Sequence, residues 1–443
     1  MPARTHSHII SFTFLFWLLA ASGSMAEENT AAKLPDTLTL GYALSLSDNN
    51  HPDNVIASSR LLAAKARQKS IEGASGFQTT LSGRLRWVEP ENNIIDDGND
   101  DNMIALTARK RLFDFGQSED SVSAAKAGVD AQELKVINYR AQRRIDIMQA
   151  FFNVILADLA YARDNELMAI KYVRFDRAQD RHRLGQIAAV ELLNAENEYH
   201  VTRTVRYASD VRRRATRATL ANILNHPGEL PTNLVRPELD VFDREIPEIE
   251  DLQTQVLETN PAIQALRFDL LASQKKVASA RARKKPTVDL ELQAADHSRY
   301  SRNNYRYQAG LLFEVPLGTS GAIDADIAEQ RALMTAASAA LIKAEMNARQ
   351  RVLELWQELY VLNARRDEAK VFSEYRDTAL DRDRGLYELD VSADLGDSLA
   401  LYSQANYQRA KADYDFAIAW AELDAILGKP VNVQKQQTST DKK

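Results

Sequence analysis

Four stretches of the chain alternate between apolar and polar residues. In one of them, Val288, Leu290 and Leu292 fall on one side, while Asp289 and Glu291 fall on the other. A period of two is the pattern of a β-strand with one apolar and one polar face. The sequence therefore predicts four amphipathic strands, at about residues 77–87, 104–113, 287–295 and 305–316.

The polar sides of these strands carry many charges. Strands of about ten residues with one apolar face are typical of outer-membrane β-barrels, where the polar side faces a water-filled lumen. A soluble antiparallel sheet with one face on a core shows the same alternation, so the pattern alone leaves both structures open. The candidate lumen-facing residues are Arg84, Arg86, Arg109, Arg111, Asp289, Glu291 and Glu314.

Four strands are too few to close a barrel, because the smallest stable barrels need about eight. If the strands cross a membrane, several copies of the chain must share one barrel. Two copies would supply about eight strands and three copies about twelve.

Long helices are predicted after the second and the fourth strand. The two stretches, about residues 116–183 and 318–388, would each extend about 100 Å at 1.5 Å per residue. Their apolar residues recur in steps of three and four, as in a coiled coil rather than in a helix lying on a globular core. The residues of the two stripes are Ile145, Met148, Phe152 and Ile155, and Val352, Leu355, Leu359 and Leu362.

The two halves of the sequence resemble each other. "YARDNE" from Tyr161 is matched by "NARRDE" from Asn363, 202 residues later, and "TLANILNHP" from Thr219 by "ELDAILGKP" from Glu422, at an offset of 203. Gly116 and Gly318, which close the strands, are also 202 residues apart. Matches in the same order at nearly the same offset indicate an internal duplication.

We therefore expect two structural repeats of one plan. A signal segment at residues 1–26 precedes them, and a Pro-rich belt separates them. The expected parts are a first repeat at 27–227 with a helical hairpin at 116–225, a connecting segment at 228–249, a second repeat at 250–430 with a hairpin at 318–428, and a polar tail at 431–443.

The N-terminal residues predict export. Arg4 precedes the apolar run Ile9 to Ala21, and Ser24 and Ala26 are small residues at the positions that a signal peptidase reads. Later in the chain we see no continuous apolar run of the roughly 18 to 20 residues that a membrane-spanning helix needs, so a membrane crossing would be made by strands. The chain has no Cys and a net charge of -6, or -7 without the signal segment, which argues against thiolate metal sites and against nucleic acid as a partner.

Several motifs carry a resemblance to a known family. They are "NPAIQAL" from Asn260, the helix-to-strand junction "ARARKKPTVDLEL", the strand-to-helix junction "VPLG" from Val315, and the hairpin tip "RLGQIAAVELLNAENEY" from Arg183. In this order and with this duplication, the chain resembles the TolC family of outer-membrane efflux and type I secretion channels.

The resemblance implies a fold that is mainly helical with a β-barrel part. Three copies would share a twelve-strand barrel in the outer membrane and a tube of twelve helical strands in the periplasm. Helices about 10 Å apart give such a tube a diameter near 38 Å, with about 25 to 30 Å clear inside. The resemblance also implies partners: a periplasmic adaptor protein and an inner-membrane pump or ABC transporter, which would supply the energy.

The family further implies a gate and docking points. By position, the acidic ring after the second tip corresponds to Asp394 and Asp397, and Glu191 and Asn194 occupy the equivalent place in the first half. Carboxylates are also favoured in the first turn of a helix, so these acids have a structural alternative. The basic residue that family members can place before the ring is here Asp390, and the expected adaptor-docking tips are Leu184, Gly185 and Gln186, and Leu389, Asp390 and Val391.

We find no sign of an enzyme. The five His that follow the signal segment have no metal-ligand spacing, and Gly318 to Gly321 is not a phosphate loop, so we expect no catalytic, cofactor or metal site. The cargo stays open between drugs, secreted protein and metal ions. The alternative hypothesis is an exported coiled-coil structural or adhesive protein without a pore, which would not need four duplicated amphipathic strands.

Overall fold

The computed structural model describes residues 34–48, 51–89, 99–229, 233–299, 304–389 and 395–431. The signal segment, Asp390, Val391, Asp394 and nearly all of the polar tail lie outside these ranges. The main elements are α2 (Pro52–Ala74), β2 (Gln78–Arg84), β3 (Met103–Phe113), α3 (Gln117–Arg183), α4 (Ala189–Ile223), α5 (Ile249–Thr259), α6 (Pro261–Ala282), β5 (Thr287–His297), β6 (Tyr307–Glu314), α7 (Ala322–Glu388) and α8 (Leu395–Ile426).

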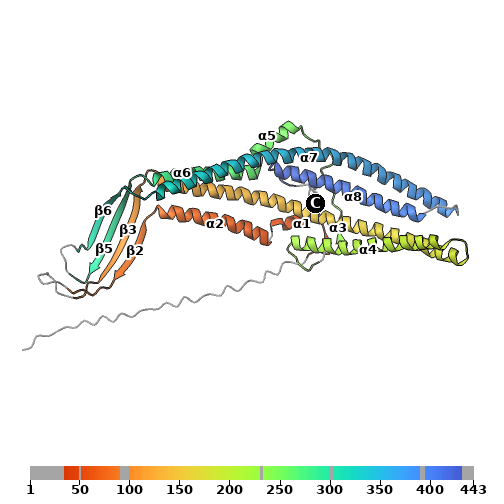
Figure 1. Cartoon of the computed structure of the whole chain (residues 1–443), viewed down its shortest axis with the longest axis horizontal. Helices are drawn as coiled ribbons and strands as arrows, with labels where there is room; N and C mark the ends of the chain where they lie inside the picture. The colour runs from red at the N-terminus through yellow and green to blue at the C-terminus, as the bar shows by residue number, and fades with distance from the viewer. Residues whose placement is uncertain are drawn as a thin grey trace, which may run out of the picture. The chain divides into compact units, whose positions relative to one another are not determined.

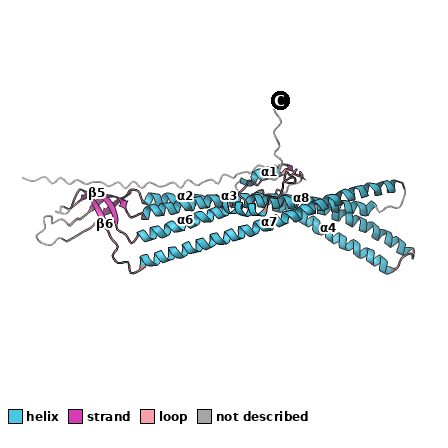
Figure 2. Ribbon diagram, turned by 90° about the horizontal axis from the view of Figure 1, so that it is seen from above, coloured by secondary structure: helices cyan, strands magenta, loops and turns pink. Residues whose placement is uncertain are grey.

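The helices pack in two sets that share α3 and α7. On the side of the strands, α2 contacts α3, α3 contacts α6 and α6 contacts α7. On the side of the helical tips, α4 contacts α3, α3 contacts α8 and α8 contacts α7. The strands lie at one end of this unit and the tips of the two hairpins at the other (Figure 1 and Figure 2). The fold is thus mainly helical with a small sheet, as predicted.

Each long helix begins where the chain turns out of a strand through two left-handed residues. Phe115 and Gly116 have φ of 54° and 89°, and Ser320 and Gly321 have φ of 47° and 79°. Glycine adopts this conformation without a steric penalty, so it fits the last position of the turn. Since Gly321 has the positive φ, it is the structural counterpart of Gly116, in place of the Gly318 that the sequence match indicates. The sequence match differs because φ cannot be read from the sequence.

The core lies in the middle of the helical body. All eight residues of the two predicted apolar stripes are buried there. Phe152 of α3 stacks on Tyr414 of α8, with ring centroids 4.3 Å apart and planes within 3°. Burial raises the pKa of the Tyr414 hydroxyl to about 12, so this side chain stays neutral in the core.

Helix α3 differs from our expectation about apolar runs. One 18-residue window of it is apolar enough to cross a membrane by length and composition, the only such helix among the described residues. Half of that window is buried inside the protein. The reason is packing, because α3 contacts α2, α4, α6 and α8 along its length and needs apolar residues on more than one side.

The connecting segment between the repeats lies against the helices. Its short strand β4 (Asn233–Leu234) pairs in parallel with β1 (Thr37–Leu38), next to the short helix α1 (Leu40–Ser45). Further along, Arg244 makes two hydrogen bonds of 2.8 and 2.9 Å to the buried Asp424 of α8, and Trp356 of α7 donates to the carbonyl oxygen of Pro247. These contacts join the segment to the second hairpin.

The four long strands form one antiparallel sheet in the order β2-β3-β5-β6. Since β3 pairs with β5, the two repeats meet in the middle of the sheet, and β2 and β6 form its edges. The register between β3 and β5 shifts once, between Arg111 and Phe113, next to the turn into α3.

Candidate channel wall and helical tips

The sheet has one polar face, and six of the seven predicted lumen residues lie on it, while Arg86 follows the end of β2. In the register, Arg109 is opposite Glu291 and Arg111 is opposite Asp289. Both pairs form ion pairs across the strands, and Nε of Arg111 lies 2.8 Å from Oδ1 of the buried Asp289. Opposite charges directly across an antiparallel pair stabilise it, so these residues also fix the register.

The remaining predicted lumen residues have other surroundings. Arg86 pairs with Asp101 beside the end of β2. Arg84 lies opposite Met103, with its Nη2 3.3 Å from the Met103 sulfur, and Glu314 lies opposite Thr287. Most of the charge on the polar face is therefore neutralised within the sheet.

The other face of the sheet is mainly apolar, with Lys110 and Asp296 as exceptions, and it is uncovered. Leu81 is 68% exposed, Leu311 is 70% exposed and Tyr307 is 78% exposed. Monomeric soluble proteins rarely leave a contiguous apolar face of this kind in water. The strands have 7 to 11 residues, close to the roughly 9 to 11 that a tilted strand needs to cross a bilayer. The geometry favours a lipid-facing surface over a soluble core.

The edges of the sheet are open. Among the described strands, β2 pairs only with β3 and β6 only with β5. Because four antiparallel strands alternate in direction, β2 and β6 run in opposite senses, and the β6 edge of one copy can join the β2 edge of another in antiparallel pairing. The sheet can thus be extended by further copies of itself.

The predicted docking tips follow the ends of the two 67-residue helices. Leu184 is the C-cap of α3 and Leu389 the C-cap of α7, and their exposed fractions are 71% and 74%. Gly185 has φ of 70°, and Gln186 donates a backbone hydrogen bond to the carbonyl oxygen of Arg181. The turn thus projects Leu184 outward, whereas Asp390 and Val391 of the second tip lie outside the described residues.

The structure describes three of the four predicted gate residues. Asp397 lies in the first turn of α8 and forms an ion pair with Arg174 of α3. Glu191 lies in the first turn of α4 and is exposed, and Asn194 contacts Glu198 of the same helix at 3.4 Å. Asp397 therefore approaches α3, and Asp394 lies outside the described residues.

Sequence reasoning missed the polar contacts that join the two hairpins between the core and the helical tips. Arg163 of α3 donates to the side-chain oxygen of Gln404 at 3.0 Å and lies over the ring of Tyr407, and Ser403 donates to Glu166. Arg174 and Asp397 continue this row toward the tips. A signal existed, because buried apolar residues of α3 become sparse beyond Leu159, and a helix contact without apolar residues must be polar. We call this set the inter-hairpin seam: Arg163, Glu166, Arg174, Asp397, Ser403, Gln404 and Tyr407.

A second polar contact closes the first hairpin. Lys171 of α3 lies 2.6 Å from Glu198 of α4, and its hydrogen bond holds the pKa of that carboxyl below the usual value. The pKa of Asp383 is lowered likewise by hydrogen bonds from Ser398 and Arg382. Among the residues that the structure describes, no group of three or more His, Asp or Glu is arranged to hold a metal ion.

A charged sheet face, an uncovered apolar face and two long helical hairpins are the features of an outer-membrane channel fold. The fold matches solved channels of this class. The outer membrane protein VceC of Vibrio cholerae is 17% identical, with a TM-score of 0.71 over 89% of this chain and 97% of that one. The CmeC outer membrane channel of Campylobacter jejuni is 14% identical, with a TM-score of 0.72 over 88% and 85%.

Sequence comparisons agree with the fold. Residues 252–429 match the family model "Outer membrane efflux protein". Protein CyaE of Bordetella pertussis is 26% identical over 215 residues, which cover 48% of this chain and 45% of that protein. The matched region thus spans less than half of this curated relative. The chain has the TolC-type channel fold, and its second half carries the outer membrane efflux protein domain.

Proposed function

We propose that this chain is the outer-membrane exit duct of a tripartite export system and passes substrates across the periplasm and the outer membrane. The observation that carries the proposal is the sheet, with a charged face, an uncovered apolar face and two open edges. A structural coiled-coil protein has no use for these three features together.

Three copies close the ring in this proposal. Their sheets would combine into a barrel of about twelve strands, the size at which a lumen can stay open to water. The helical flanks support the same closure, because apolar side chains are exposed on α2 and α4 at one flank and on α7 at the other. The most exposed of them are Leu62, Val190 and Val211, and Met346 and Val371.

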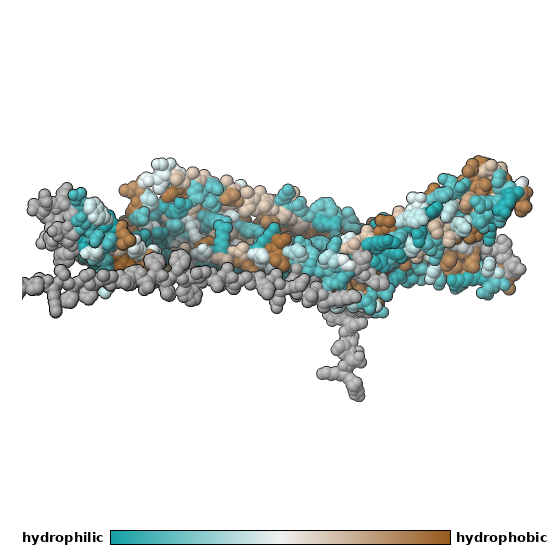
Figure 3. Space-filling model, turned by 90° about the horizontal axis from the view of Figure 1, so that it is seen from below, coloured by the Kyte–Doolittle hydropathy of each residue, from teal (hydrophilic) through white to brown (hydrophobic). Residues whose placement is uncertain are grey.

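The flank with α2 and α4 faces the viewer in Figure 3, where apolar residues lie exposed among polar ones. A head-to-tail contact of one flank with the opposite flank of the next copy buries both, and it closes into a ring when the rotation per copy fits.

The helical tips are the proposed contact for a periplasmic adaptor, which connects the duct to an inner-membrane pump or ABC transporter. Leu184 and Leu389 lie at equivalent ends of α3 and α7, so each copy offers two exposed apolar tips. Burying these exposed leucines against a partner would remove apolar surface from water, which favours such a contact.

The proposed gate lies above these tips. Asp394, Asp397, Glu191 and Asn194 are its candidate residues, and the inter-hairpin seam would keep the second hairpin against the first. Where family members can place a basic residue before the acidic ring, this chain has Asp390. In the proposal, Arg174 of α3 supplies the positive charge instead. In this arrangement the closed state is held by Arg174 and Asp397.

A deletion strain tests the function. We expect either sensitivity to dyes, detergents and antibiotics with unchanged exported proteins, or loss of one exported protein with normal drug tolerance. The first result identifies a small-molecule duct and the second a protein secretion channel. A strain that is unchanged in both respects, in conditions where the protein is made, would contradict the proposal.

A further inference from the structure

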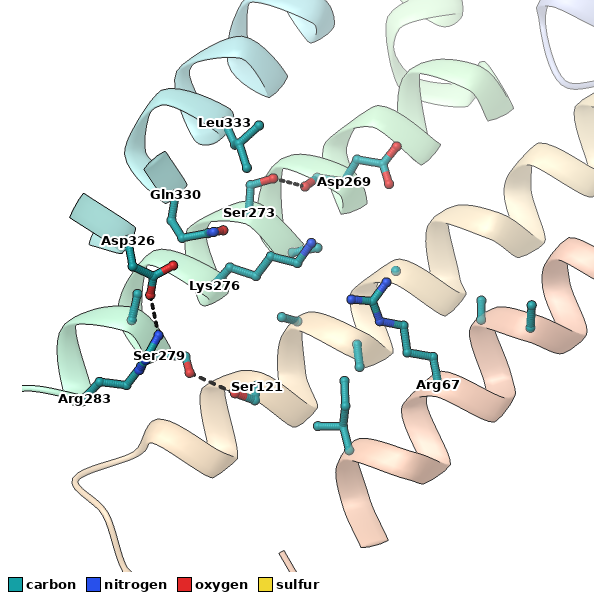
Figure 4. Close-up of a pocket in the computed structure, with 18 residues that line it drawn as sticks. Arg67, Ser121, Asp269, Ser273, Lys276, Ser279, Arg283, Asp326, Gln330 and Leu333 are labelled. Atoms are coloured by element: carbon teal, nitrogen blue, oxygen red, sulfur yellow. Dashed lines mark hydrogen bonds and ion pairs between the residues drawn. The ribbon is translucent and has the colours of Figure 1, made fainter. Parts of the chain in front are cut away.

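A cavity of about 840 Å³ lies between α2, α3, α6 and α7, close to the strands. Figure 4 shows its labelled side chains, which come from all four helices. Small residues such as Ala124, Gly128 and Ala272 leave the space open. Its lining also includes polar and charged side chains, namely those of Arg67, Asp269, Lys276, Arg283, Asp326 and Gln330.

The cavity opens on the same side of the protein as the polar face of the sheet. A neighbouring hollow is lined by Gln78, Arg109, Arg111 and Asp289, which belong to that polar face. The hollow and the cavity share Ile71 and Ser121 as lining residues. The two surfaces are therefore continuous. If the polar face of the sheet lines the lumen, the cavity opens into the lumen as well.

The acidic residues of the cavity are neutralised. Asp269 accepts a hydrogen bond from Lys135 at 2.8 Å, and Asp326 accepts one from Arg283 at 2.7 Å. The serine hydroxyls are also occupied, since Ser121 and Ser279 are 2.8 Å apart and Ser279 donates to the carbonyl oxygen of Gln117.

Two cations of the cavity stay without a counter-charge. Within the described ranges, neither Arg67 of α2 nor Lys276 of α6 forms an ion pair, and both side chains are exposed. Figure 4 shows both extending into the cavity from different helices. The lining of the cavity holds three cations, Arg67, Lys276 and Arg283, and only two acids, Asp269 and Asp326, so the lining itself is positively charged.

We propose that Arg67 and Lys276 form a cationic girdle on the lumen wall that binds carboxylate-rich segments of a polypeptide cargo. The inference rests on the proposed trimeric duct, in which three copies place about six unpaired cations around one lumen. Charges that are spread around a wide lumen suit a chain with many carboxylates, because a small anion reaches only one cavity at a time. Arginine and lysine contacts to carboxylates are exchangeable in water, so the girdle can hold and release a moving chain.

Block of the channel current tests the girdle. Purified protein is reconstituted in planar bilayers, and a short polyglutamate peptide is added on the barrel side, with polylysine of equal length as the opposite-charge control. We expect polyglutamate to block the wild-type current at 0.1 M salt and polylysine not to block it. The block should vanish near 1 M salt, where the screening length falls from about 10 Å to about 3 Å.

The decisive variant is Arg67→Gln with Lys276→Gln. Losing about six screened contacts should raise the half-blocking concentration roughly tenfold or more. The matched control is Lys69→Gln with Arg281→Gln, which removes the same charge from α2 and α6 outside the cavity and should leave the block within about twofold. The charge-conserving variant Arg67→Lys with Lys276→Arg should keep it.

Other results would overturn the girdle. Equal loss of block in the two charge-removing variants would mean that only net charge matters. Equally strong block by inorganic phosphate alone would mean a small-anion site instead. A wild-type protein that forms trimers and conducts, yet is not blocked by polyglutamate, contradicts the girdle alone, whereas a wild-type protein without any conductance contradicts the proposed duct as well.

Discussion

The ion pair of Arg174 with Asp397 offers a sharp test of the gate. It joins α3 of the first hairpin to the first turn of α8 in the second. Replacing Arg174 with Ala removes the positive charge of this pair and leaves the core above untouched. If the pair holds the hairpins together at the tips, the variant should favour the open state.

The magnitude follows from the exposure of the pair. The side chains of Arg174 and Asp397 are 40% and 43% exposed, and ion pairs that are open to solvent contribute about 0.2 to 1 kcal/mol each. If three copies open together, the shift is about 0.6 to 3 kcal/mol. The ratio of open to closed channels should therefore rise about 3-fold to 150-fold.

Single-channel recording measures that ratio as the fraction of time spent at high conductance. Arg174→Ala and Asp397→Ala are compared with the double variant in a double-mutant cycle. We expect the double variant to differ little from either single variant, because one contact is lost in all three. Fully additive effects, or an unchanged open fraction in Arg174→Ala, would refute the tether.

Two further predictions follow from the contacts described above. Phe152→Ala, which removes the ring stacked on Tyr414, should lower the free energy of unfolding by about 3 to 5 kcal/mol. The control Ile137→Ala, at an exposed position on the same helix, should change it far less. Thermal unfolding of detergent-purified protein measures both, and equal shifts would contradict this prediction. Because the carboxyl pKa values of Glu198 and Asp383 are lowered in the folded protein, their contacts should persist at neutral and mildly acidic pH and be lost only as the pH falls below the ordinary values of 4.5 and 3.8. Protease accessibility of the tips should then be constant from about pH 7 to pH 5 and rise near pH 3, and a rise already at pH 6 would show that other groups control the tips.

The strands and their faces could be predicted because that signal is local, whereas the strand order and the register could not. Alternation with a period of two assigns each residue of a strand to a face. The pairing of Arg109 with Glu291 and of Arg111 with Asp289 depends on the register, which only the structure shows. The apolar stripes of the long helices were equally informative, since Phe152 and Leu359 are buried as the steps of three and four predict.

The contacts of the lower helices could not be predicted in the same way. Arg174 and Asp397 are 223 residues apart in sequence, and a polar contact has no periodic pattern that marks its partner. The sequence could not show the left-handed turn at Gly321 either, because its φ depends on how the chain leaves β6. The unpaired cations of the girdle became visible only when the partners of their acidic neighbours were known.

Cross-linking of the sheet edges tests most directly whether three copies share one closed barrel. Because the chain has no native Cys, only the introduced cysteines can form disulfides. Cysteines are placed at Leu81 on β2 and, in separate variants, at Tyr307, Ala309 or Leu311 on β6, all on the apolar face. If copies join edge to edge, one register brings the two Cβ atoms to about 4 Å and allows a disulfide. Oxidised membranes should then show a ladder of one, two and three linked copies that ends at three and disappears on reduction. Only monomers in every variant, or a ladder that continues beyond three, would contradict a closed trimeric channel.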